Sequence, residues 1–129
     1  NMILKNNEVI GILDWELSTL GHPIADFSYH CLSWRTQEAF WDQAKLKELG
    51  IPSEREYMEM YCENSGKDLS KNWEFYMAFN MFKIAGILQG ILGRVRDGTA
   101  ASKHAEERGN MVFPLSEAAW STIEENFLK

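Results

Sequence analysis

Asp14 is the residue best placed for chemistry, because it directly follows Val9–Leu13, a short run of strand-forming residues. A carboxylate at the end of a strand is held by a rigid element and still reaches solvent. Mg²⁺ prefers oxygen ligands and retains several waters, so a carboxylate in this position could bind it. The same position also suits a residue that merely begins a turn, and the spacing alone leaves both interpretations open.

Asn1 is expected to face Asp14 across a β-hairpin. Two β-rich runs, Met2–Leu4 and Val9–Leu13, flank an Asn-Asn pair, and asparagine tolerates the positive φ that a tight turn needs. In an antiparallel pair, residues near the start of one strand face residues near the end of the other. An amide oxygen of Asn1 and the carboxylate of Asp14 could then share one metal ion. The alternative is that Asn1 is only a frayed end.

The composition is that of one small domain rather than a disordered chain, with 129 residues, 45% of them hydrophobic and 25% charged. A net charge of −6 disfavours nucleic acid and anionic membrane surfaces as partners. Cys31 and Cys62 lie in apolar stretches without a metal or disulfide spacing, so we expect buried, reduced thiols in an intracellular compartment. The chain starts and stops within patterned segments and shows no secretory signal, so we expect a piece of a longer protein.

Apolar residues change to a helical period at Pro23, and residues 23–129 are predicted to be mostly helical. Ser53 and Glu56 have the spacing of a capping box, which predicts a helix start, and Gly66 would end that helix. We expect helices from Pro23 through Trp34, over Glu38–Leu49, from Ser53 to about Asn64, over Asn72–Val95, and over Ala100–Leu128 with a break or kink at Pro114.

The segment Asn72–Val95 is the longest apolar stretch, and Lys83 is its only charged residue between Phe75 and Gly93. It is expected to be the central buried helix. A membrane span is the rival interpretation, which the polar and glycine residues of the segment disfavour. The predicted fold is α+β and mostly α, with an N-terminal β-hairpin packed on about five helices or on protein outside this chain, because a lone hairpin is marginally stable.

Three stretches resemble the C-terminal lobe of aminoglycoside-phosphotransferase-like kinases, namely Asn1–Leu4, Ile10–Glu16 and Gly21–Phe27. That family has a catalytic loop of His-Gly-Asp, four residues and Asn, followed by a hairpin and an Ile/Leu-Asp-Trp/Phe-Glu metal motif. The run Leu13–Pro23 and the segment Arg94–Ala100 resemble, more narrowly, the kinase-like domain of acyl-CoA dehydrogenase family members ten and eleven.

The resemblance implies a protein-kinase-like fold that transfers a phosphoryl group from Mg²⁺-bound ATP to a hydroxyl of a small molecule, with a hydroxyacyl-CoA as the candidate acceptor. It implies a metal-site hairpin over residues 1–14 and a helical substrate subdomain over residues 23–129. By position, Asn1 and Asp14 match the metal ligands of the family.

Three further residues take expected roles from the same resemblance. Asp26 matches an aspartate that supports the catalytic-loop backbone, with a plain acid in the first turn of a helix as the alternative. Trp15 would pack under the site. The ring of His22 would satisfy backbone groups in its loop, with a catalytic histidine as the alternative. No catalytic residue is expected in the chain, because the family's catalytic Asp would lie five residues before Asn1. The nucleotide-binding N-terminal lobe is also missing from the sequence, so we expect the chain alone to be inactive.

The helical part of such kinases builds the acceptor pocket. Arg94 and Arg96 could meet CoA phosphates, since arginine binds phosphate in a bidentate manner, or they could be solvated cations at a helix end. Candidates for an apolar lining are Trp73, Met77, Met81 and Phe82, for which core packing is the alternative.

The resemblance also implies a fusion protein in mitochondria or peroxisomes, in which a dehydrogenase domain with FAD follows the kinase-like domain. Self-association is expected where the missing lobe would sit. Two alternatives remain, a non-catalytic scaffold that docks the dehydrogenase and an unrelated helical interaction domain. The pair Asn1 and Asp14 favours the enzyme, because a scaffold needs no metal ligands.

Overall fold

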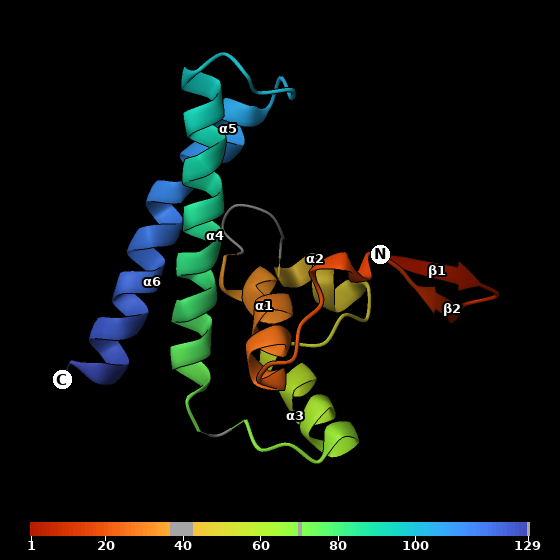
Figure 1. Cartoon of the computed structure of the whole chain (residues 1–129). Coiled ribbons are helices and arrows are strands. Elements are labelled where there is room, and N and C mark those ends of the chain that lie inside the picture. The colour runs from red at the N-terminus through yellow and green to blue at the C-terminus, as the bar shows by residue number, and fades with distance from the viewer. Residues whose placement is uncertain (37–42, 70, 129) are drawn as a thin grey trace.

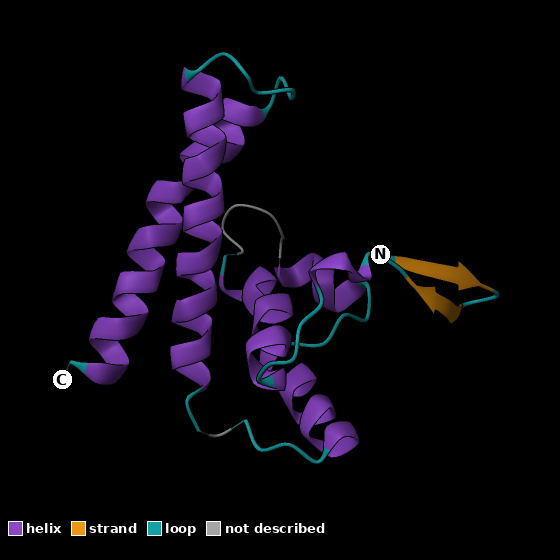
Figure 2. Cartoon of the chain, in the orientation of Figure 1, coloured by secondary structure: helices purple, strands orange, loops and turns teal. Residues whose placement is uncertain are grey.

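The computed structural model describes residues 1–36, 43–69 and 71–128 of the chain. Most of these residues are helical, and two strands form a small sheet (Figures 1 and 2). This confirms the α+β, mostly α fold class. The elements in chain order are β1 (Met2–Lys5), β2 (Glu8–Ile12), the 3-10 helix η1 (Trp15–Leu17), α1 (Pro23–Arg35), α2 (Gln43–Glu48), α3 (Glu54–Ser65), α4 (Trp73–Arg96), α5 (Ala105–Asn110) and α6 (Val112–Phe127).

The two strands form the predicted antiparallel hairpin, in which Lys5 pairs with Glu8 next to the turn. Asn6 and Asn7 have φ values of 52° and 63°, and a turn with two left-handed residues matches the twist of its strands. The hairpin extends away from the helices (Figure 1), and every strand residue except Gly11 is exposed. The hairpin is therefore not packed on the helices, which corrects the first of the two expected partners, and packing on protein outside this chain stays a prediction.

The helical core forms around α4, which packs against α1, α5 and α6. The stacked rings of Phe27 and Tyr61, with centroids 3.8 Å apart, attach α3 to α1. Burial of these apolar side chains supplies the main stabilisation of the helical part. The buried cluster consists of Ile24, Phe27, Cys31, Leu32, Leu69, Trp73, Met77, Met81, Ala85, Val112 and Leu115.

One face of α4 is open, so the expectation of a fully buried helix is correct only in part. Phe75, Phe79 and Phe82 are exposed, whereas Met77 is completely buried. By length and composition α4 could cross a membrane, which is weak evidence because core helices pass the same test. Asn80, in the first third of α4, is buried and donates to the Ala25 carbonyl and to Ser28 Oγ, both at 2.8 Å, so its amide group is satisfied within the protein.

Local signals fix the ends of the other helices. The Ser53 and Glu56 capping box is formed, and Gly66 ends α3 in the left-handed conformation, as predicted. The C-terminal helical region is divided at Met111, and Pro114 lies in the first turn of α6, where a missing amide costs no hydrogen bond. Of the helix predicted over Glu38–Leu49, α2 accounts for the second half, and residues 37–42 lie outside the described residues.

Arg35 joins three helices at one point. Its Nε donates to both carboxylate oxygens of Glu54, at 2.9 and 2.7 Å, and its Nη groups donate to Glu74 at 3.2 and 2.9 Å. The indole N–H of Trp73 also donates to Glu54, at 3.2 Å. Because Glu54 begins α3 and Glu74 lies in α4, these bonds fix both helices to the end of α1.

The thiols agree largely with expectation. Cys31 is completely buried, and both cysteines are free, but Cys62 is only half-buried. Burial, together with the charge of Glu54, raises the pKa of Cys31 to about 12, and the nearby Arg35 opposes this effect. Cys31 is therefore a neutral core side chain rather than a nucleophile.

Candidate functional site

The side chains of Asn1 and Asp14 meet at the base of the hairpin. Asn1 Nδ2 donates to Asp14 Oδ2 at 2.6 Å, and the Leu13 amide donates to the Asn1 carbonyl at 2.9 Å. The antiparallel pairing of β1 and β2 thus brings together two residues that are thirteen positions apart. This is the juxtaposition that the strand pattern predicts.

Asp14 has a strained backbone, with φ 71° and ψ 45° in the left-handed region. Such a conformation costs a residue other than glycine about 1–3 kcal/mol and is found often at functional sites, although aspartate tolerates it better than most. The hydrogen bond from Asn1 and a bond from Trp15 Nε1 to the Ile12 carbonyl, at 2.7 Å, brace this corner. Trp15 itself is 63% exposed, so the expectation that it packs under the site is wrong.

Asp14 opens onto a groove of about 640 Å³ between the hairpin base, α1 and α4. The groove brings together residues from two separate stretches of the chain, 14–29 and 79–83. Its charged or ring-bearing lining includes Asp14, Trp15, His22, Asp26, Tyr29 and Lys83. A carboxylate-bearing corner beside a cation is an arrangement that can hold a metal ion and its anionic ligand together.

His22 has the structural role expected of it. Its Nδ1 accepts a hydrogen bond from the Ile24 amide at 3.3 Å and so caps α1. Its ring stacks on Tyr76, with centroids 5.1 Å apart, which connects the loop to α4. Asp26 lies in the first turn of α1 and is exposed to the groove. Its role in supporting a catalytic loop stays a prediction.

The donor set at this corner fits Mg²⁺. Asn1 and Asp14 can each present a side-chain oxygen, because a half-turn of the amide exchanges Nδ2 for Oδ1. In the described part of the chain, three or more His, Cys, Asp or Glu side chains do not gather into a metal-binding group. A complete protein cage is not required, since Mg²⁺ usually takes one or two protein oxygens together with waters and phosphates.

A second groove of about 400 Å³ lies between α4 and α6 and is almost entirely apolar. Phe75, Phe79 and Phe82 line it from α4, and Trp120 lines it from α6. Phe79 also lines the groove beside Asp14, so the polar and the apolar groove adjoin.

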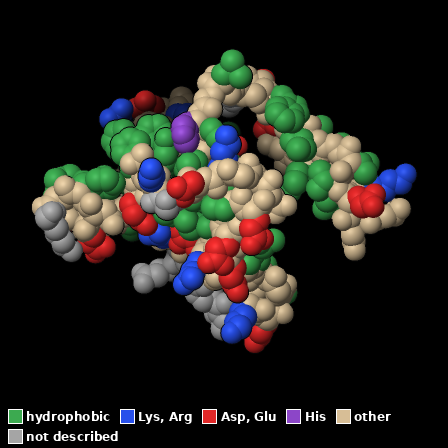
Figure 3. Space-filling model, turned by 90° about the horizontal axis from the view of Figure 1, so that it is seen from below, with side chains coloured by type: hydrophobic (Ala, Val, Ile, Leu, Met, Phe, Trp, Pro, Cys, Tyr) green, Lys and Arg blue, Asp and Glu red, His purple; other side chains and the backbone are tan. Residues whose placement is uncertain are grey.

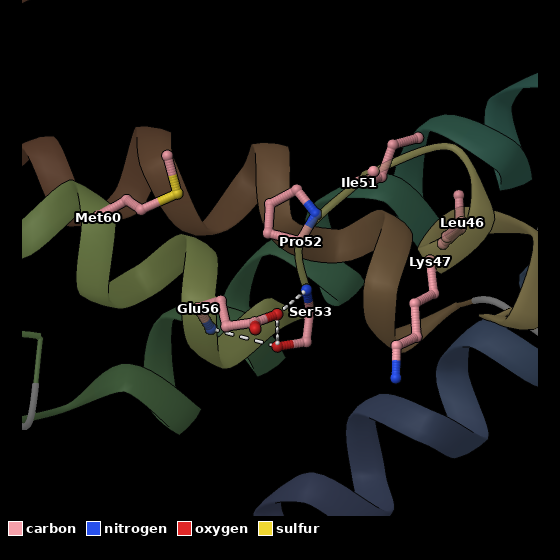
Figure 4. Close-up of a pocket in the computed structure, with 8 residues that line it drawn as sticks. Leu46, Lys47, Ile51, Pro52, Ser53, Glu56 and Met60 are labelled. Carbon is pink, nitrogen blue, oxygen red and sulfur yellow. Dashed lines mark hydrogen bonds between the residues drawn. The ribbon is translucent and has the colours of Figure 1, made fainter.

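A third hollow, between α2 and the start of α3, is structural (Figure 4). The Glu56 carboxylate accepts from the Ser53 amide at 2.8 Å and from Ser53 Oγ at 2.7 Å. These bonds lower the pKa of Glu56. Ser53 and Glu56 of this hollow thus serve the helix cap and are engaged with each other.

The residues expected to contact the acceptor lie in different environments. Trp73 and Met77 are buried in the core and reach neither groove, so core packing is their role here. Met81 is buried with them, and Phe82 is exposed in the apolar groove. Arg94 and Arg96 are exposed near the end of α4, and Arg96 pairs with Asp97 at 3.1 Å.

Lys83 and Tyr29 are groove residues that sequence reasoning did not assign to the site. The Nζ of Lys83 lies 5.0 Å from the centroid of the Tyr29 ring. The sequence signal for Lys83 was that it is an isolated charge in an apolar helix. Assigning it to the groove also requires the packing of α4 against α1, which the periodicity of the sequence does not give.

Comparison with known proteins agrees with the resemblance. Residues 1–61 match the model of the Phosphotransferase enzyme family. Acyl-CoA dehydrogenase family member 10 of Mus musculus is 43% identical over 88% of this chain and 11% of that protein. Acyl-CoA dehydrogenase family member 11 of Homo sapiens is 36% identical, and the probable acyl-CoA dehydrogenase IBR3 of Arabidopsis thaliana is 37% identical, each over 95% of this chain and 16% of the relative.

The chain therefore spans only 11 to 16% of the length of these relatives. None of the solved structures matches it. The matches confirm the resemblance drawn from the sequence, to the phosphotransferase family over residues 1–61 and to acyl-CoA dehydrogenase family members 10 and 11 over most of the chain.

Proposed function

We propose, starting from this phosphotransferase kinship, that the chain supplies the metal-binding corner and the acceptor side of an ATP-dependent small-molecule kinase. The observation that carries the proposal is the 2.6 Å contact between Asn1 and Asp14 at the mouth of a groove that also contains Asp26 and Lys83. An amide and a carboxylate at the end of a hairpin are the two oxygen donors that the family resemblance assigns to the metal.

Asn1 and Asp14 would hold Mg²⁺, whose contribution when bound is to neutralise phosphate charge. The Asn1 amide would turn its Oδ1 toward the ion, since its Nδ2 now faces Asp14. The hairpin pairing and the strained backbone at Asp14 fix the carboxylate in position. The general base would come from the stretch that precedes Asn1 in the family motif, so these residues bind and orient but do not remove the proton.

The acceptor in this proposal is an alcohol that carries an apolar chain, such as a hydroxyacyl-CoA. The apolar groove between α4 and α6 shares Phe79 with the groove beside Asp14, which supports such an acceptor. The relatives are named acyl-CoA dehydrogenase family members, and these names support an acyl-CoA compound as the acceptor. Arg94 and Arg96 are candidates for the CoA phosphates from their place on α4.

A second candidate function is a docking module without catalysis. Its support is the exposed apolar surface of the hairpin, where Ile3 is 44% and Ile10 is 58% exposed. Figure 3 shows hydrophobic side chains on the surface of the hairpin, at the right of the view, with charged groups at its far end. The kinase function predicts Mg²⁺-dependent nucleotide binding, and the docking module predicts none.

The test uses the longer protein that contains this segment, incubated with γ-³²P-ATP, Mg²⁺ and a hydroxyacyl-CoA. We expect Asp14→Asn to lower phosphate incorporation by at least about a hundredfold, because removal of a metal ligand removes transition-state charge stabilisation. Glu8→Gln is the matched control, since Glu8 is an exposed carboxylate of the same hairpin, lies next to the turn, and is outside both the metal motif and the groove lining. An Asp14→Asn protein as active as the Glu8→Gln protein would contradict the proposal.

A further inference from the structure

Lys83 is an isolated cation on an apolar helix. Between Glu74 and Arg94 it is the only charged residue of α4, and its neighbours along the helix are Phe82 and Ile84. Lys83 is exposed and does not belong to the buried face of α4, so it contributes no packing to the core. Its charged end instead enters the groove beside Asp14.

The packing beneath Lys83 fixes its position. Asn80, almost one turn earlier, is 1% exposed and donates to the Ala25 carbonyl and to Ser28 Oγ, which fastens α4 to α1. The ammonium group lies 5.0 Å from the Tyr29 ring centroid, a cation–π distance that holds it at the groove wall. Both contacts come from α1, so the same two helices set the distance between Lys83 and the N-terminal end of the groove.

Lys83 forms no ion pair within the described residues. No carboxylate there pairs with it, although Asp14 and Asp26 line the same groove. Asp14 is engaged with Asn1 instead. A cation that contacts the protein through an aromatic ring and has no carboxylate partner can still bind an anionic ligand.

The charges of the groove indicate when an anion would bind. Two carboxylates and one ammonium leave the groove with one net negative charge, which repels phosphate. One Mg²⁺ at Asn1 and Asp14 reverses this to one net positive charge, and Lys83 accounts for all of that excess. Anion binding should therefore depend on the metal ion and be strengthened further by Lys83.

We propose that Lys83 is a phosphate-binding residue of this groove and contacts a phosphate oxygen of the ligand held at the Asn1–Asp14 corner. The inference deepens the proposed kinase function and rests on it. The phosphate could belong to the nucleotide or to the acceptor, and the recognition chemistry is the same in both cases.

The experiment measures binding of two probes to the 129-residue chain by calorimetry, in Mg²⁺ and in EDTA. Tripolyphosphate represents the nucleotide tail, and methyl phosphate represents a phosphate monoester on an acceptor. Lys83→Met removes the charge, and Lys83→Arg retains it. Lys103→Met is the control, since Lys103 is an exposed lysine outside the lining of the groove. Circular dichroism and thermal melting establish that each variant is folded.

We expect Lys83→Met to weaken Mg²⁺-dependent tripolyphosphate binding by about five- to tenfold, a modest loss because the groove is open to solvent. Lys83→Arg should stay within about twofold of wild type, and Lys103→Met should have no effect. A matching loss for methyl phosphate would assign the contact to the acceptor as well. Equal affinities of the Lys83→Met and Lys103→Met proteins for both probes would overturn the inference.

A separate Mn²⁺ titration distinguishes failure of this inference from failure of the proposed function. Mn²⁺ binding is followed by electron paramagnetic resonance without phosphate, in wild type and in Asp14→Asn. Mn²⁺ binding that depends on Asp14, with phosphate affinity that does not depend on Lys83, would refute the role of Lys83 alone. Absence of Mn²⁺ binding would count against the proposed function, and Lys83-dependent binding of phosphate in EDTA would then show an anion site of another kind.

Discussion

Substitution of Gly109 by alanine tests the packing of α5 against α4. Gly109 is buried, and a Cβ added there would lie 2.5 Å from Leu92 Cδ2, 2.6 Å from Leu92 Cγ and 3.3 Å from the Leu92 amide nitrogen. Real Cβ contacts are not this short, so Leu92 must leave its position or α5 must move away from α4. The obstructing atoms include a branch carbon and a backbone nitrogen, which do not yield as a flexible chain end would.

The expected cost follows from two opposing terms. Overpacking of a filled contact costs about 1–3 kcal/mol, and an off-rotamer leucine costs about 0.5–1.5 kcal/mol as part of it. Alanine regains less than about 1 kcal/mol of helix propensity, because Gly109 lies next to the last residue of α5. We therefore expect Gly109→Ala to lower the free energy of unfolding by about 1–2 kcal/mol.

Gly86→Ala is the matched control. Gly86 lies inside α4, and nothing stands within 4 Å of a Cβ placed there, so alanine should raise the free energy of unfolding by about 0.5–1 kcal/mol. Urea unfolding followed by circular dichroism at 222 nm gives both values with the m-value as a check. The opposite signs of the two changes are the test. A Gly109→Ala protein that equals or exceeds wild type in stability would refute the close packing of α5 on α4.

Two other predictions concern the helical core. Arg35→Met should lower the free energy of unfolding by about 1–2 kcal/mol, because it leaves the carboxylates of Glu54 and Glu74 close together without their cation. The control Arg55→Met removes an exposed ion pair and should change the free energy of unfolding by less than about 0.5 kcal/mol. Similar losses for the two variants in urea unfolding would contradict the role of Arg35 in joining the helices. The raised pKa of Cys31 means that the folded state favours the neutral thiol. The stabilisation that comes from this neutral thiol is complete below pH 9 and is lost as the pH rises from 9 to about 12. The loss amounts to at most about 4 kcal/mol in the free energy of unfolding. Comparison of wild type with Cys31→Ala isolates this loss, and parallel stability curves across that range would contradict it.

The features that short-range rules determine were predictable from the sequence. The Asn-Asn turn, the capping box at Ser53 and the helix break near Pro114 each depend on a few neighbouring residues. The contact between Asn1 and Asp14 followed from the hairpin, since pairing of two adjacent strands leaves little freedom in register. The metal-binding proposal rests mainly on this hairpin and on the contact between Asn1 and Asp14.

The features that depend on packing between distant segments were not predictable. An apolar helix such as α4 shows no periodic signal for its open face, so the exposure of Phe75 and Phe79 and the burial of Trp73 and Met77 could not be separated. The place of Lys83 in the groove depends on contacts with α1, more than fifty residues earlier in the chain. The expectation that the hairpin packs on the helices failed for the same reason, because a strand pattern identifies an apolar face but not its partner.

The exposed hairpin has a consequence for association of the chain. Each strand of a two-stranded sheet pairs on one side only, so within the described residues β1 and β2 each present backbone amides and carbonyls on an outer edge. Such edges can accept a further extended segment on either side and enlarge the sheet by main-chain hydrogen bonds. Lys5 and Glu8, next to the turn, are the charged side chains on these strands, and they stand at one end of the ladder only. At the other end of β2 the Ile12 carbonyl already accepts from Trp15 Nε1, so strand addition on that edge would be limited to the part between Ile12 and the turn.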